Sequence, residues 1–136
     1  MIVLVDTDVL IDVALDRAPH AAAAGQLLDL LEQQPGSAYA AWHTIANFYY
    51  LTAPTKGRAD ARGFIVDLTR FVEVSPTTTD SLRRAARLET RDFEDALQVA
   101  AAEACGADVI ATRSVRDYAK SPVRAATPRA LLIGMT

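Results

Sequence analysis

Apolar residues along this chain follow two patterns, one typical of buried strands and one typical of helices. Short, nearly continuous apolar runs are expected to form strands of a parallel sheet, since such strands are buried on both faces. The clearest runs lie at residues 2–5, 71–74 and 108–111, with a weaker candidate at 37–40. Between them, apolar residues recur at helical spacing. This alternation predicts an α/β fold with a short, mostly parallel central sheet flanked by helices, with two helices between some strands.

The predicted helices have apolar faces and residues that end helices. Apolar residues at helical spacing occur around residues 24–31, 45–52, 61–68, 82–88 and 93–104. We expect Pro35-Gly36, Pro54 and Gly106 to end the three helices that precede them. Asp8 is expected to cap a first helix after the strand at 2–5.

Composition excludes several classes of protein. The chain has 136 residues, of which 51% are hydrophobic and 23% charged, so we expect one folded domain, 1–136, and not a disordered chain. No apolar run approaches the ~20 residues of a membrane helix, and the run at 1–5 lacks the features of a signal peptide. With Cys105 as the one cysteine, neither an intramolecular disulfide nor a cysteine zinc site is possible. We therefore expect a soluble, cytoplasmic protein.

The net charge of −3 conceals an uneven distribution of charge. Residues 1–34 contain six acidic side chains and one arginine, whereas residues 112–136 contain five basic side chains and one aspartate. This separation is consistent with an acidic pocket beside a basic surface.

Polar residues that could carry chemistry follow the predicted strands. In parallel sheets, ligands bind beyond the carboxyl ends of the strands. The segments at or near such ends are Asp6-Thr7-Asp8, Asn47, Asp92-Phe93-Glu94-Asp95, and Thr112-Arg113-Ser114 with Asp117. Carboxylates gathered from several segments repel one another unless a cation neutralises them, and oxygen ligands suit Mg²⁺ or Mn²⁺. No motif for a softer metal is present, and His20 and His43 are the only histidines.

Each of these acids also has a purely structural interpretation. Asp6 or Asp8 could serve only as a helix cap, and the spacing of Asp92 and Asp95 is that of a capping box. Glu94 and Asp117 could be solvated, and Asp12 and Asp16 are expected on the polar face of the first helix. His43, beside Trp42, is expected to be a packing residue. It is the joint pattern of a strand-end acid, an acidic helix start and a strand-end Thr-Arg pair that favours function.

Three motifs in this order resemble those of PIN domains, the fold of VapC-type toxin ribonucleases. Residues 2–10, with Asp6-Thr7-Asp8-Val9-Leu10, resemble the opening strand and its Asp-Thr-Asn-Val-Leu turn. Residues 92–98 resemble the central acidic helix start of the branch with an Asp-Phe-Glu-Asp motif. Residues 110–118 resemble the Thr-Arg-Asn-x-x-Asp-Phe segment, with Ser114 in place of Asn. Residues 127–132 resemble the closing strand and short tail.

The resemblance implies RNA hydrolysis that depends on Mg²⁺ or Mn²⁺. It implies that the catalytic acids are Asp6, Asp95 and Asp117, and that the metal ligands are Asp6, Asp95, Asp92 and Asp117. A metal-activated water would attack the phosphodiester in line. Supporting roles would belong to Asp8, Asn47, Glu94, Thr112 and Ser114. RNA phosphates would be bound by Arg113, Arg116, Lys120 and Arg124. Family members pair with a small antitoxin, commonly as toxin homodimers.

One departure from the family pattern leaves other functions open. Most members have a glutamate where this chain has Asn47, and an amide supplies no negative charge. Asp92 and Glu94 are expected to compensate for the missing charge. If they do not, the chain would be a weak or inactive PIN scaffold that binds RNA or a protein partner. A further alternative is a HAD-type phosphohydrolase, although Leu10 stands where that motif has threonine.

Overall fold

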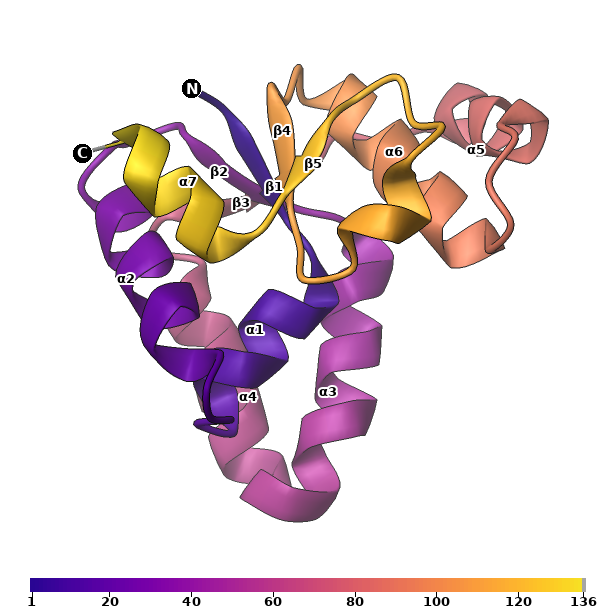
Figure 1. Ribbon diagram of the computed structural model, residues 1–136. Helices are drawn as coiled ribbons and strands as arrows, with labels where there is room; N and C mark the ends of the chain where they lie inside the picture. Colours follow the sequence, from indigo (N-terminus) through magenta and orange to yellow (C-terminus); the bar gives the residue numbers. More distant parts are fainter. Residues whose placement is uncertain (136) are drawn as a thin grey trace.

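A five-stranded, wholly parallel sheet forms the centre of the computed structural model, which describes residues 1–135 (Figure 1). The strands lie in the order β3-β2-β1-β4-β5. Their bounds are β1(Val3–Val5), β2(Ala38–Ala40), β3(Val72–Val74), β4(Val109–Ala111) and β5(Ala125–Ala126). The predicted α/β class and parallel sheet are confirmed. The predicted end of the domain, Thr136, lies outside the described residues.

The helices lie between the strands, with pairs after β1, β2 and β3, as the sequence predicts. The crossovers through helices follow from the parallel arrangement, since parallel neighbours cannot be joined by a tight turn. The bounds are α1(Thr7–Ala14), α2(Ala21–Glu32), α3(Trp42–Lys56), α4(Arg58–Leu68), α5(Thr79–Arg87), α6(Phe93–Ala104), the 3₁₀ helix η1(Val115–Tyr118) and α7(Pro128–Met135).

Alternate residues of the central strand β1 face two separate hydrophobic clusters. Val3 and Val5 pack with residues of α1, α2 and α3, whereas Leu4 packs with Val99 of α6 and with Tyr118. Figure 1 shows α2 and α7 on one side of the sheet, α6 on the other, and the α3–α4 hairpin extending beyond one end. All three β1 side chains are fully buried, and burial of each contributes ~1.5–3 kcal/mol. The carboxyl end of the sheet, where β1 ends, therefore provides a rigid base for the residues that follow the strands.

Three predicted boundaries are wrong. Asp6, not Asp8, caps α1, because its carboxylate accepts from the Thr7 backbone N–H at 2.7 Å. Helix α3 continues through Pro54 to Lys56, with the Gly57 backbone N–H donating to the Ala53 carbonyl at 2.9 Å beyond the proline. The segment after Thr127 is helix α7 and not a strand, and the closing strand is the two-residue β5 just before it.

Within residues 1–135, no helix combines the length and the apolar character needed to cross a membrane.

Candidate active site

Asp6 directly follows β1, the central strand, and so lies in the middle of the carboxyl end of the sheet. Its backbone N–H continues the sheet by donating to Ala111 of β4 at 2.9 Å. One carboxylate oxygen accepts from Thr7 and from the Gln98 amide at 2.8 Å, and the other accepts from the Tyr118 hydroxyl at 3.1 Å. Only 8% of Asp6 is exposed, and this burial raises its pKa even though the hydrogen bonds oppose the rise. Asp6 is thus held rigidly by three different elements.

The start of α6 brings two more carboxylates to this edge. Asp92 is the cap of α6, since its side chain accepts from the Glu94 backbone N–H at 2.8 Å. Asp95 makes no such cap contact, and its pKa is raised to about 6 by burial and by the charges of Asp92, Asp117 and Asp6. The mutual repulsion shows that carboxylates from β1, α6 and η1 lie within electrostatic range of one another.

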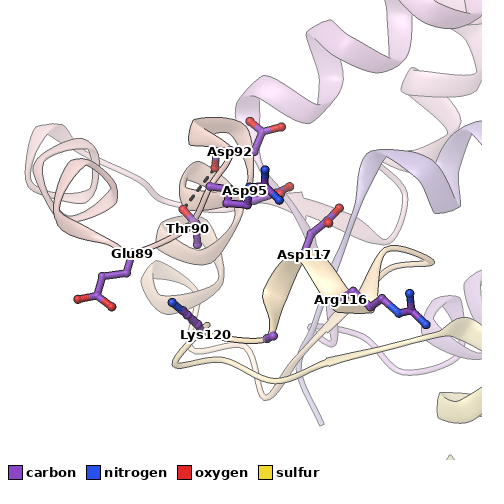
Figure 2. A pocket seen from close by; sticks show the side chains of 9 residues that line it. Glu89, Thr90, Asp92, Asp95, Arg116, Asp117 and Lys120 are labelled. Carbon is purple, nitrogen blue, oxygen red and sulfur yellow. Dashed lines mark hydrogen bonds between the residues drawn. The ribbon is translucent and has the colours of Figure 1, made fainter.

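A cleft of about 520 Å³ opens beside these acids, with both acidic and basic walls. Asp92, Asp95 and Asp117 line it together with Arg91, Arg116 and Lys120 (Figure 2). In Figure 2 the carboxylates of Asp95 and Asp117 point toward the same space, while the Arg116 guanidinium and the Glu89 carboxylate point away from it. Neither Asp6 nor its partner Tyr118 lines the cleft, but the charge of Asp6 contributes to the raised pKa of Asp95, which does.

Asp8, the second residue of α1, is another acidic residue near the site. Its Oδ2 atom accepts from the Thr112 hydroxyl at 3.2 Å, the Arg113 backbone N–H at 3.1 Å and the Ser114 hydroxyl at 3.3 Å. Its Oδ1 atom is buried and has no hydrogen-bond partner among residues 1–135. Burial and the nearby charge of Asp6 raise the pKa of Asp8. Asp8 thus fastens the loop after β4 to α1.

Arg113 does not extend toward the cleft. Its guanidinium makes two hydrogen bonds to Asp12, at 2.6 and 3.1 Å, and Arg17 binds the same carboxylate at 2.7 Å. The expectation that Asp12 lies on an exposed polar face is wrong, because Asp12 is 1% exposed. A carboxylate is buried this deeply only when it is paired, and two arginines supply the pairing here.

The remaining predicted residues lie around this centre at different depths. Asn47 is half-buried on α3, one turn after Thr44, whose hydroxyl accepts from Gln98 at 2.8 Å. Glu94 is exposed, yet its charge adds to the rise in the pKa of Asp6, which places it within electrostatic range of the site. Arg124 is exposed beside β5 and does not line the cleft.

Two side chains that orient Asp6 were not predicted from the sequence. They are Gln98 and Tyr118. Gln98 is a fully buried polar residue within the otherwise apolar stripe of α6, and this interruption was the available signal. Tyr118 follows Asp117 directly, and burial together with the acids keeps its pKa raised, so the hydroxyl remains a donor.

The donor set suits a hard divalent cation by charge and by atom type. Carboxylate oxygens are the ligands that Mg²⁺ and Mn²⁺ prefer, and the pKa of Asp95 is raised first by burial and then by the negative charges of Asp92, Asp117 and Asp6, which a bound cation would offset. As the side chains stand in residues 1–135, no three His, Cys, Asp or Glu residues are arranged to hold a metal ion. Asp117 is exposed, so its side chain has room to turn toward Asp95, whereas Asp92 would first have to give up its hydrogen bond to the Glu94 backbone.

Solved structures with the same fold include a bacterial toxin and two proteins bound to DNA. VapC20 of Mycobacterium tuberculosis, a toxin that cleaves the sarcin–ricin loop, matches with a TM-score of 0.64 and 18% identity, over 79% of this chain and 86% of its own. VapBC2 of Rickettsia felis, bound to a promoter DNA fragment, matches with a TM-score of 0.72 and 14% identity, over 93% and 98%. FitAB bound to a DNA fragment gives 0.67 and 18%, over 93% and 95%. At these identities the likeness shows a shared fold.

Comparison of the sequence itself identifies the family. No curated protein matches the chain significantly. The family model described as PIN domain matches residues 2–116, a range that contains every acid of the site except Asp117. That match covers most of the chain, which therefore belongs to the PIN domain family.

Proposed function

We propose that this protein is a Mg²⁺- or Mn²⁺-dependent endoribonuclease, the toxin of a type II toxin–antitoxin pair. The observation that carries the proposal is that Asp92, Asp95 and Asp117, from the start of α6 and from η1, line one cleft, with the pKa of Asp95 raised by burial and by the charges of Asp92, Asp117 and Asp6. Charge concentrated in this way is costly to the fold, and it is useful where a cation and a phosphodiester must meet. The fold shared with a ribosomal-RNA-cleaving toxin supports RNA as the substrate.

The residues have separate roles in this proposal. Asp6, Asp95 and Asp117 would hold the cation, with Asp92 as a further ligand. When bound, the cation would lower the pKa of a water molecule and neutralise charge on the scissile phosphate. Gln98 and Tyr118 hold Asp6 in one orientation. Lys120, from the wall of the cleft, would bind a phosphate beside the cleaved bond, and Arg116, whose guanidinium points away from the acids, would bind a phosphate farther along the RNA.

The proposed partners are a small antitoxin and a second copy of the chain, in the cytoplasm. Two of the structures that share the fold are of the VapBC2 and FitAB systems. Large apolar side chains on α3 and α4 are exposed, including Trp42 at 72%, Tyr50 at 75% and Val66 at 65%. Exposed apolar surface of this kind is typical of protein interfaces.

Replacing Asp6 with Asn tests the catalytic proposal. Asparagine is as good a helix cap as aspartate, so α1 should still form, but the negative charge is lost. We expect cleavage of a labelled RNA in Mg²⁺ to fall at least about 100-fold, a loss of ~2.7 kcal/mol in transition-state stabilisation, with little change in thermal unfolding. Asp67→Asn, on the exposed surface of α4, is the matched control and should cleave normally. Undiminished cleavage by folded Asp6→Asn protein would refute the proposed site.

The same assay examines the alternative of an inactive PIN scaffold. Asn47 in place of the usual glutamate is the observation that favours this alternative, since it removes one charge from the site. RNA binding without cleavage by the wild-type chain, at any concentration of Mg²⁺ or Mn²⁺, would support the scaffold. Leu10 is fully buried in the core, so it offers nothing to a phosphohydrolase site.

A further inference from the structure

The loop at residues 112–114 is clamped to α1 at two points, one turn apart. At the first point, three donors of the loop converge on the Oδ2 atom of Asp8. At the second, the Arg113 guanidinium forms a two-pronged contact with Asp12, four residues later on the same face of the helix. The loop also braces itself, because the Ser114 backbone N–H donates to the Thr112 hydroxyl at 3.0 Å.

This loop determines where η1 begins. Ser114 directly precedes η1, and its carbonyl accepts from the Asp117 backbone N–H at 3.0 Å. From η1, Tyr118 reaches Asp6 and Asp117 faces Asp95, while Arg116 of η1 and Lys120 just after it line the cleft. A shift of the loop would therefore displace an acid, a base and the tyrosine that orients Asp6.

The contact with Asp12 is built to hold position rather than to neutralise charge. Arg17 already binds Asp12, at 2.7 Å, so the buried carboxylate would stay paired without Arg113. What Arg113 adds, and Arg17 does not, is a second link between α1 and the loop after β4, beside the one at Asp8 and across 101 residues of sequence. A planar guanidinium that meets a carboxylate through two hydrogen bonds fixes both distance and orientation, which an ammonium group cannot do.

We propose that Arg113 is a positioning residue, which through its fork to Asp12 holds the 112–114 loop and so sets the place of Asp117 and Tyr118 in the active site. This inference rests on the proposed nuclease function for its kinetic consequence, although not for its structural one. It replaces the role in RNA binding that the sequence suggests for Arg113.

Hydrogen exchange of the metal-free chain measures the clamp directly, without any activity. In Arg113→Ala we expect faster exchange at the amides of Arg113, Ser114 and Asp117, each of which is hydrogen-bonded within this loop and η1. Arg17→Ala is the matched control, because it removes the other partner of Asp12 and leaves the loop clamped. Unchanged exchange in Arg113→Ala, or equal acceleration in Arg17→Ala, would overturn the inference.

Kinetics and binding then separate positioning from RNA contact. We expect Arg113→Ala to lower kcat at least about tenfold, because displacements near 1 Å can cost ~100-fold, while KM changes little. In an Asp6→Asn background that prevents cleavage, the salt dependence of RNA binding should not change. A residue that binds phosphate would instead lower the log–log slope by ~0.7 and leave kcat intact. That second pattern would overturn the proposal.

Arg113→Lys distinguishes the two-pronged geometry of the guanidinium from its positive charge. Lysine keeps the positive charge and loses the two-pronged geometry. The loop amides of Arg113→Lys should therefore exchange as fast as those of Arg113→Ala, and kcat should fall nearly as much. Wild-type exchange and kcat in Arg113→Lys would show that charge suffices and would refute positioning by the fork. If the wild-type chain cleaves no RNA at all, the proposed function fails, and the exchange results still decide whether Arg113 positions the loop.

Discussion

Asp95 shows how the site alters the chemistry of one residue. Its pKa rises from 3.8 to about 6 because of burial and because Asp92, Asp117 and Asp6 repel its negative charge. A carboxyl group whose pKa is higher in the folded chain binds its proton more tightly there, so protonation favours folding. The stability that protonation provides is complete below pH ~4 and is lost as the pH rises to about 6.

We therefore expect the metal-free chain to lose thermal stability between pH 4.5 and 6.5, with a smaller loss in Asp95→Asn. The pH values are chosen to bracket the raised pKa, and melting followed by circular dichroism in EDTA measures the effect. Asp67→Asn controls for the loss of an exposed charge. Millimolar Mn²⁺ should raise the wild-type melting temperature more at the higher pH. Parallel curves for wild type and Asp95→Asn would contradict the expectation.

The positions of strand-end residues were predictable, whereas their partners were not. Asp6 and Thr112 follow buried runs, and adjacent parallel strands must end on one edge, so their proximity follows from pattern alone. Gln98 could be placed on α6, but helical phase does not say that its amide reaches Asp6. From the sequence alone, Arg113 is compatible with either an RNA-binding surface or an ion pair within the protein. Which of the two it forms depends on Asp12, which is 101 residues away in the sequence.

At the scale of elements, chain ends and short segments departed from prediction. Strand β5 has two residues, which is too short to show any period. The helix after it did carry a signal, because the Thr127 hydroxyl accepts from the Ala130 N–H at 3.1 Å and Pro128 takes the first helical position. Threonine followed by proline is a typical helix start. The longer buried strands and the apolar helix faces were predicted well, since their periods extend over several residues.

The turn between α3 and α4 depends on Gly57. Its φ of 92° and ψ of 149° lie in a region that essentially only glycine adopts, and this non-helical conformation ends α3. We expect Gly57→Ala to lower the free energy of unfolding by ~1–3 kcal/mol, measured by urea denaturation. Gly63→Ala, six residues on within α4 and with open space for a methyl group, should instead raise it by ~0.5–1 kcal/mol. An unchanged free energy of unfolding in Gly57→Ala would show that the turn accommodates alanine.

At the scale of the whole molecule, the fold brings the acidic start of the chain against its basic end. Asp6, Asp8 and Asp12 lie at or in α1, and the segment from Thr112 to Lys120 packs directly on them or beside them. Part of the basic charge is used within the protein, since Arg113 pairs with Asp12. Arg116 and Lys120 remain at the cleft. The charge asymmetry of the sequence thus becomes an acidic centre with a narrow basic margin.

This arrangement predicts that RNA affinity depends on a few local cations and not on net charge, which is −3. In the cleavage-deficient Asp6→Asn background, Arg116→Ala with Lys120→Ala should lower the slope of log affinity against log salt by ~1.4, or ~0.7 per phosphate contact. Arg58→Ala with Arg70→Ala, on α4 and just after it, makes the same change in net charge away from the cleft. That pair should leave the slope unaltered. Filter binding of a single-stranded RNA across a salt series measures both. An equal decrease in the two double variants would mean that RNA responds to the overall field of the protein, and the proposed path through the cleft would be wrong.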